Sequence, residues 1–184
     1  MPQPAARDGE ILSAFGIENA ARLTLPARAD DIKKLKVGTF VLLSGVVYTA
    51  RDQAHKRIAA AIERGEELPF DLSGAAIYYC GPTPAKVGQV IGSCGPTTSG
   101  RMDKYAPLLI ENGVRVMIGK GVRNAEVRTA IGKHGAAYLS AIGGAAALYQ
   151  STVKSCELIA YPDLGCEAVY KLTVEDFPAV VTIT

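Results

Sequence analysis

Residues 39–65 read TFVLLSGVVYTARDQAHKRIAAAIERG, and this stretch decides the fold class. The part from Thr39 to Tyr48 is an apolar run with Gly45 inside it, which predicts a strand. The residues after it predict a helix, because one helical face collects the apolar side chains Ala54, Ile58, Ala61 and Ile62. Gly65 is placed to end that helix.

Strands and helices keep alternating along the rest of the chain. Further strands are predicted at residues 75–79, 114–118, 136–142, 168–174 and 179–183. Asn124 is placed to cap a helix that Gly132 closes, and another helix follows Gly143-Gly144 around Leu148. This alternation predicts an α/β fold with a largely buried mixed or parallel sheet.

Length and composition fit one compact domain. We expect residues 1–20 to be an N-terminal extension of unknown role and residues 21–184 to form the single domain. A hydrophobic content of 48% with 21% charged residues is typical of a globular protein. The formal net charge of +2 is too small to indicate nucleic-acid binding, and basic residues do not cluster with aromatic ones.

The sequence also argues against a membrane segment. The start of the chain, MPQPAARD, lacks the basic and apolar regions of a secretory signal. The uncharged run from His134 to Val153 contains polar side chains and three glycines, so a buried strand followed by a helix explains it better than a membrane span. We therefore expect a cytoplasmic protein without a membrane partner.

The residues with the most chemistry are 92–103, which read GSCGPTTSGRMD. Glycine and proline interrupt regular structure there and leave backbone N–H groups free to face a ligand. The apolar segment 87–91 precedes the loop and predicts a strand, and apolar residues follow at helical spacing. A helix N-terminus with Arg101 one turn inside favours an anion, either phosphate or carboxylate. Pro107 then breaks this helix or begins a second one.

Nucleotide motifs do not match this loop. A P-loop needs Lys followed by Ser or Thr after its last glycine, whereas Gly100 is followed by Arg101 and Met102. The spacing of Gly92 and Gly95 does not fit a dinucleotide fingerprint either. Thr97 and its neighbours can also serve as helix caps, a role that is compatible with ligand binding.

The four cysteines, Cys80, Cys94, Cys156 and Cys166, show no C-x-x-C spacing. In a reducing cytosol they are expected to remain thiols with packing roles. Cys94 is the one with a place in the key loop, where it could serve as a spare ligand. The sequence thus predicts no metal site formed by this chain.

The loop resembles a signature of the iron–sulfur hydro-lyases, specifically the beta subunit or C-terminal domain of class I fumarases and tartrate dehydratases. Further segments agree in order at residues 45–57, 79–84, 118–121, 142–146, 167–168 and 174–178. The resemblance covers about Leu23 to Pro178. It implies a swivelling β/β/α domain that works with a cluster-bearing alpha subunit, typically in an α2β2 assembly.

The resemblance also implies where the cofactor lies. A 4Fe-4S cluster is expected on the partner alpha subunit, with no ligand from this chain. Its open iron would bind the substrate and polarise the departing hydroxyl. This chain would then be colourless and inactive alone.

Three cations follow predicted strands or lie in the key loop: Arg51, Arg101 and Lys120. Guanidinium matches a carboxylate with two parallel hydrogen bonds, and the carboxyl ends of strands are where α/β folds collect ligands. The resemblance implies that these residues bind the carboxylates of a C4 dicarboxylate and stabilise the enediolate formed from it. It also implies that Thr97 is the catalytic base.

Asp52, His55 and Asp103 are secondary candidates for the base, because they have ordinary acid–base side chains. His55 lies four residues after Arg51 and can share its helix face, although a structural histidine is the alternative reading. The two aspartates can instead complement helix starts.

Reversible hydration of fumarate to malate is the predicted reaction, and the chain is predicted to be the beta subunit of that hydro-lyase. Tartrate or mesaconate dehydration is an alternative, since these substrates share the same carboxylate groups. Two other classes stay open: a stand-alone anion-binding module, and a structural subunit with a vestigial site.

Overall fold

The computed structural model of the chain describes residues 20–142 and 145–184. The predicted N-terminal extension, apart from Ala20, and the predicted turn at Gly143-Gly144 lie outside the described residues. Within the described part, no helix is both long and apolar enough to cross a bilayer.

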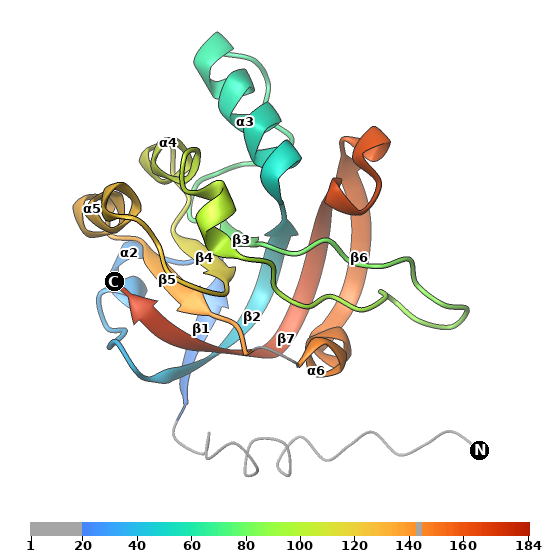
Figure 1. The fold of residues 1–184 in the computed structure, drawn as a ribbon. Helices are drawn as coiled ribbons and strands as arrows, with labels where there is room; N and C mark the ends of the chain where they lie inside the picture. Colours follow the sequence, from blue (N-terminus) through green and yellow to red (C-terminus); the bar gives the residue numbers. More distant parts are fainter. Residues whose placement is uncertain (1–19, 143–144) are drawn as a thin grey trace.

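A mixed sheet of seven strands organises the molecule and closes on itself (Figure 1). Its strands, in spatial order, are β1 (Ala21–Leu25), β2 (Phe40–Thr49), β3 (Ala76–Tyr78), β4 (Val116–Gly119), β5 (Ala137–Ser140), β7 (Val169–Ile183) and β6 (Val153–Ala160). Neighbours from β1 to β5 are parallel, whereas β7 runs antiparallel to both β5 and β2 and so completes a ring. The α/β class with a mixed sheet is confirmed.

The short parallel strands β3 and β4 are buried on both faces, which explains their continuous apolar runs. The buried residues form two clusters, an inner core enclosed by the ring and an outer core between the ring and the helices. In β3, Ala76 and Tyr78 pack into the inner core, and Ile77 between them packs into the outer core. β4 repeats the pattern, with Val116 facing inward and Met117 outward. Successive strand side chains point to opposite faces, so both cores draw on the same short strands.

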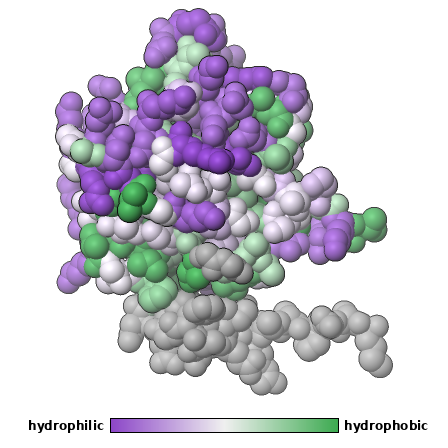
Figure 2. Space-filling view, in the orientation of Figure 1, coloured by the Kyte–Doolittle hydropathy of each residue, from purple (hydrophilic) through white to green (hydrophobic). Residues whose placement is uncertain are grey.

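Three helices, α3 (Asp52–Arg64), α4 (Ala106–Glu111) and α5 (Ala125–His134), supply the outer core (Figure 1). The surface over them is mostly hydrophilic (Figure 2), as expected for helices with one buried face. The short α2 (Ala29–Ile32) and α6 (Ala146–Thr152) contribute instead to the inner core, through Ile32 and Tyr149.

The helices α3 and α5 both end at a glycine, but α5 ends at a different glycine from the predicted one. Gly65 adopts the left-handed conformation (φ 65°) that ends α3, as predicted. The prediction that Gly132 closes α5 is wrong, because the helix continues to His134 and Gly135 takes the left-handed position (φ 64°). Asn124 caps α5 as predicted, since its side chain accepts the Val127 N–H at 2.9 Å.

The strand content exceeds the prediction. The two segments predicted at 168–174 and 179–183 are one strand, β7, which has a bulge where Asp176 takes a positive φ of 52°. β1 and β6 were not predicted. These strands flank the ring, and β6 exposes charged residues such as Lys154 and Glu157, which weakens its apolar pattern.

The predicted strand at 87–91 does not form. The segment 82–93 instead projects from the ring as an irregular arm (Figure 1), with Val87 fully exposed and Val90 half exposed. Gly88 takes a positive φ of 83° within a turn, which interrupts any extended run. Apolar sequence alone therefore misplaced this segment.

The helix predicted after the key loop is split. A short 3₁₀ helix, η1 (Ser99–Met102), comes first, and α4 begins afresh with Pro107 in its first turn. Pro107 thus lies in the first turn of a second helix, one residue after the first position that was predicted for it. No α-helix N-terminus lies at the loop, so the predicted helix-dipole contribution to anion binding is lost.

Candidate active site

The candidate site lies where β2, β3 and β4 end. Arg51 follows β2 by two residues, Tyr79 follows β3 directly and Lys120 follows β4 directly. Because these three strands are parallel neighbours, their carboxyl ends lie at the same edge of the ring.

The key loop is hydrogen-bonded across these strand ends. The Thr97 N–H donates to the Tyr79 carbonyl at 2.7 Å, and the Lys120 N–H donates to the Thr97 carbonyl at 3.4 Å. The Ser99 N–H donates to the Lys120 carbonyl at 2.9 Å. The loop thus extends the sheet by a few residues and places the half-buried Thr97 between β3 and β4.

Ser99 anchors the loop from below through its side chain. Its hydroxyl is buried and lies 2.9 Å from the Tyr138 hydroxyl, which donates to the Gly121 carbonyl at 2.8 Å. Tyr138 has one proton to give, so Ser99 is the donor of the first bond. Gly119 leaves the room for this contact, since a Cβ there would lie 2.1 Å from Ser99 Oγ.

Arg51 reaches the same corner from the start of α3. Its side chain is about a quarter exposed, and its Nε lies 3.2 Å from Glu167 Oε1 in the 3₁₀ helix η2 (Pro162–Glu167). The two atoms form an ion pair by distance, but their alignment does not meet hydrogen-bond geometry. A Cβ on Gly81 would lie 3.0 Å from Arg51 Cδ, so the arginine packs against the chain just beyond β3.

The other two cations are exposed. Arg101 lies in η1, two residues after the anchored Ser99, and Lys120 lies beside Thr98 in an isolated parallel bridge. Within the described residues, neither side chain forms an ion pair. The structure therefore brings Thr97, Arg101 and Lys120 together on connected backbone, with Arg51 on the adjoining strand end.

His55 is enclosed rather than presented to a ligand. Its Nδ1 lies 2.9 Å from the Arg51 carbonyl, which requires the proton on that nitrogen, and its ring meets Tyr79 edge-on at 5.2 Å. Burial lowers the pKa of His55 to about 4, and the Arg123 charge adds to the decrease. The imidazole is therefore neutral at physiological pH.

The two aspartates have different environments. Asp103 is buried and both of its oxygens are occupied, one by Arg123 Nε at 2.6 Å and the other by the Asn124 N–H at 2.7 Å. Asp52 begins α3, and its Oδ1 is buried without a hydrogen-bond partner among the described residues. Asp103 is thus committed to a structural contact.

Buried polar atoms without a geometrically sound hydrogen bond lie around Arg51 and Tyr79. Within the described part of the chain they are Arg51 Nε, Asp52 Oδ1, Tyr79 Oη and Arg123 Nη2. A buried polar group without a partner destabilises the fold by about 1–3 kcal/mol. Such atoms are more often found at functional sites than elsewhere in a protein interior.

The cysteines do not form a cluster-binding set. Among residues 20–142 and 145–184, no three Cys, His, Asp or Glu side chains gather as metal ligands. Burial raises the pKa of Cys94 to about 11 and also raises the pKa of Cys80, which disfavours the thiolate that iron requires. These residues do not fit an iron–sulfur cluster.

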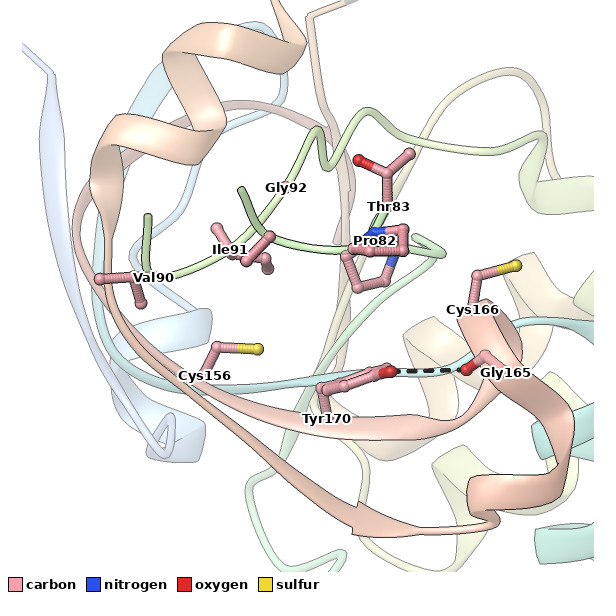
Figure 3. A pocket seen from close by; sticks show the side chains of 11 residues that line it. Pro82, Thr83, Val90, Ile91, Gly92, Cys156, Gly165, Cys166 and Tyr170 are labelled. Carbon is pink, nitrogen blue, oxygen red and sulfur yellow. Dashed lines mark hydrogen bonds between the residues drawn. The ribbon is translucent and has the colours of Figure 1, made fainter. Parts of the chain in front are cut away.

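The other two cysteines line a separate pocket of about 390 Å³, shown in Figure 3. Cys156 comes from β6 and Cys166 from η2, and the arm covers the pocket with Pro82 and Ile91. None of the candidate site residues lines this pocket.

Comparison with known proteins decides the family. Residues 5–184 match the family model described as "Fumarase C-terminus". The chain belongs to this fumarase C-terminal family. The resemblance predicted from its sequence segments is therefore confirmed. The matched relatives are hydro-lyases.

Two kinds of relatives match this fumarase-family chain. It is 44% identical over 155 residues to "Fumarate hydratase class I, anaerobic" and 42% identical over 180 residues to "Fumarate hydratase class I, aerobic", both of Escherichia coli. These matches cover 83% and 95% of this chain but only 28% and 33% of the relatives. The chain thus spans about a third of those proteins.

The third relative is close to this chain in length. The chain is 42% identical over 159 residues to "Putative L(+)-tartrate dehydratase subunit beta" of Methanocaldococcus jannaschii, and the match covers 83% of this chain and 82% of the relative. Proteins of this family therefore occur both as part of a long chain and as a chain named as a subunit.

Sequence reasoning missed the residues that support the site. Glu167, Tyr138 and Arg123 had no assigned role, although all three contact the site or its loop. Glu167 lies in a segment that matched the family, which was the available signal. A buried arginine such as Arg123 cannot be told from a surface one by its sequence context.

Proposed function

We propose that this chain is the beta subunit of an iron–sulfur-dependent hydro-lyase that hydrates fumarate reversibly to malate. In this proposal it supplies the carboxylate-binding cations Arg51, Arg101 and Lys120, and Thr97 as the base. The proposal also includes a fold of the swivelling β/β/α type and a location in the cytoplasm.

One observation carries the proposal: Arg51 and Lys120 follow the ends of the parallel strands β2 and β4, and the loop with Thr97 is hydrogen-bonded across the ends of β3 and β4. The backbone hydrogen bonds fix Thr97 beside Lys120, and in this proposal the Thr97 hydroxyl faces the same substrate as the cations. Pre-organised positive charge is what a dicarboxylate requires, because charge develops on one carboxylate in the transition state.

The proposed roles follow from charge and geometry. In the dehydration direction, Thr97 Oγ1 takes the proton from the carbon next to a carboxylate, which leaves a dianionic enediolate. Lys120 and Arg101 stabilise that charge, and both also favour the deprotonated hydroxyl that a threonine base needs. Arg51 exchanges its ion pair with Glu167 for the second carboxylate.

The rest of the enzyme is assigned to a partner. The long fumarate hydratases contain about twice as much chain again beyond the matched part, and one relative is named as a subunit. Because the cysteines here do not fit a cluster, we assign the 4Fe-4S cluster to a partner alpha subunit in an α2β2 assembly.

The experiment compares the chain alone with the chain co-expressed with a cluster-bearing alpha chain from the same organism. We expect fumarate consumption in the assembled, anaerobically purified complex and none with this chain alone. Fumarate hydration by the single chain after iron–sulfur reconstitution would contradict the two-subunit assignment.

Substrate choice is decided in the same assay. Tartrate and mesaconate are tested beside fumarate at matched concentrations, and the substrate with the highest kcat/KM is the assigned one. Dicarboxylate binding without turnover in an assembled complex would instead support an anion-binding module.

A further inference from the structure

A buried arginine lies beneath the loop that carries the candidate site. Arg123 follows β4, and its side chain is completely excluded from solvent. Its Nε donates to Asp103 Oδ1 at 2.6 Å, and Asp103 Oδ2 accepts the Asn124 N–H at 2.7 Å. A buried charge is tolerated only when it is paired in this way.

The guanidinium also lies between two tyrosine rings. Its carbon is 5.2 Å from the centre of the Tyr79 ring and 5.0 Å from the centre of the Tyr138 ring. A planar cation can contact both rings with its faces while its edge meets the Asp103 carboxylate. A lysine ammonium cannot make all three contacts.

Each neighbour of Arg123 holds one part of the candidate site. Tyr79 accepts the Thr97 N–H through its carbonyl, and Asp103 lies two residues after Arg101. The Tyr138 hydroxyl bonds to Ser99 and to the carbonyl of Gly121, which adjoins Lys120. Each of the three site segments is therefore linked to the Arg123 side chain through one of its neighbours.

We propose that Arg123 is a positioning residue, which fixes Thr97, Arg101 and Lys120 relative to one another without touching the substrate. For its catalytic consequence, the proposal rests on the proposed hydro-lyase function. Apolar packing can stabilise a core as well as a buried ion pair does. What apolar packing cannot supply is the simultaneous orientation of three segments by one rigid group.

The test uses Arg123→Met, Arg123→Lys and the control Arg115→Met. Arg115 precedes β4, at the other end of that strand, and its Nη1 donates to the Ile110 and Val114 carbonyls. Amide hydrogen exchange is measured by NMR on the chain, and kcat is measured on the assembled complex where each variant is fully folded. The control reports the effect of losing a partly buried arginine away from the site.

We expect Arg123→Met to speed exchange at the Thr97 and Ser99 amides about tenfold and to lower kcat up to about 10²-fold, as small misplacements do. Arg123→Lys should be intermediate, and Arg115→Met should leave both readouts at the wild-type level. If Arg123→Met does not fold, Tyr138→Phe removes one of the three links with little change in packing. It should speed exchange at Ser99.

Wild-type exchange at Thr97 and Ser99 in a folded Arg123→Met, or at Ser99 in Tyr138→Phe when that variant replaces it, would overturn the proposal. A fall in thermal stability with wild-type kcat would do the same, because it would indicate a purely structural role. Absence of turnover in the wild-type complex would contradict the proposed function alone, because amide exchange does not depend on turnover.

Discussion

The connection between β3 and α4 has two halves of opposite character. The first, the arm 82–93, includes the apolar Val87 and Val90, yet it projects from the ring with both side chains exposed. The second, residues 94–103, is rich in hydroxyl groups, yet Ser99 and Asp103 are buried. Hydropathy predicts the reverse arrangement.

Hydrogen-bond partners explain the difference. The second half pairs with the ends of β3 and β4 and with Tyr138 and Arg123, so its polar groups stay satisfied when buried. The arm bonds mainly to itself, for example from the Thr83 N–H to the Ser93 carbonyl, and Gly88 turns it away from the sheet. Burial in this connection thus follows the available partners rather than the apolar content.

The largest expected effect concerns Thr97 in the buried half. If its hydroxyl is the base, Thr97→Val should lower kcat of the assembled enzyme by about 10²- to 10⁴-fold while dicarboxylate affinity stays similar. Thr97→Ser should retain activity, and Thr98→Val, at the exposed neighbour, is the matched control. Wild-type solvent-proton exchange into malate in Thr97→Val would reassign the base.

A pH effect is expected from His55, which is packed against Tyr79 where the connection begins. Its pKa is lowered in the folded state from 6.5 to about 4, so the unfolded chain binds a proton first. Neutral His55 therefore contributes roughly 3 kcal/mol to the free energy of unfolding above pH 6.5, and this stabilisation is lost as the pH falls toward 4.

Denaturant unfolding between pH 4 and pH 7 measures this effect. His55→Gln should reduce the slope of unfolding free energy against pH in that window. His134→Gln, at the end of α5, is the control. An unchanged slope in His55→Gln would show that carboxylates alone set the acid stability.

Arg101 tests whether the exposed end of the buried half binds an anion. Arg101→Lys keeps the charge and loses the two-pronged geometry, so kcat/KM should fall by a factor equivalent to about 2 kcal/mol. Lys104→Arg, on the exposed side of the same turn, should leave kcat/KM unchanged. Equal kinetics for all three proteins would place the carboxylate contacts elsewhere.

Substitutions of two glycines test how tightly the chain is packed beneath the buried half and in α5. Gly119→Ala forces a Cβ against Ser99 Oγ and the Tyr79 ring, and such overpacking should destabilise the fold by about 1–3 kcal/mol. A Cβ on Gly132, in the last turn of α5, would meet no atom within 4 Å, so Gly132→Ala should stabilise the helix by about 0.5–1 kcal/mol. Thermal unfolding of the two variants should therefore shift in opposite directions.

The smallest effect is expected at the exposed Val87 of the arm. Val87→Ala removes a fully exposed side chain and should change the unfolding free energy by less than about 0.5 kcal/mol. Ile91→Ala, at the buried base of the arm, should destabilise by about 2 kcal/mol or more. Similar losses in both variants would indicate that the arm is packed in solution.

Local sequence patterns predicted many of the helices and strands. The strand and helix of residues 39–65, the Asn124 cap and the α/β class follow from apolar spacing and turn residues, which act over a few positions. The pairing of β7 with β2 could not be predicted, because it joins residues that are 123 to 140 positions apart, from Tyr48 with Lys171 to Phe40 with Val180. Arm exposure likewise depends on partners that periodicity does not reveal.

The candidate site was predictable only through the family resemblance. Nothing in the local sequence of Arg51 or Lys120 separates them from surface cations, and their proximity depends on three strands ending side by side. The occupied state of Asp103 depends on Arg123, which is twenty residues further along. Such long-range polar contacts leave no local pattern.

Closure of the ring also has a consequence for synthesis on the ribosome. β2 is complete at Thr49, whereas its antiparallel partner β7 begins at Val169, about 120 residues later. At about 5–20 residues per second, β2 waits roughly 6–24 s with one edge unpaired. An open strand edge favours aggregation, so we expect a nascent chain that lacks β7 to aggregate more readily than the complete chain.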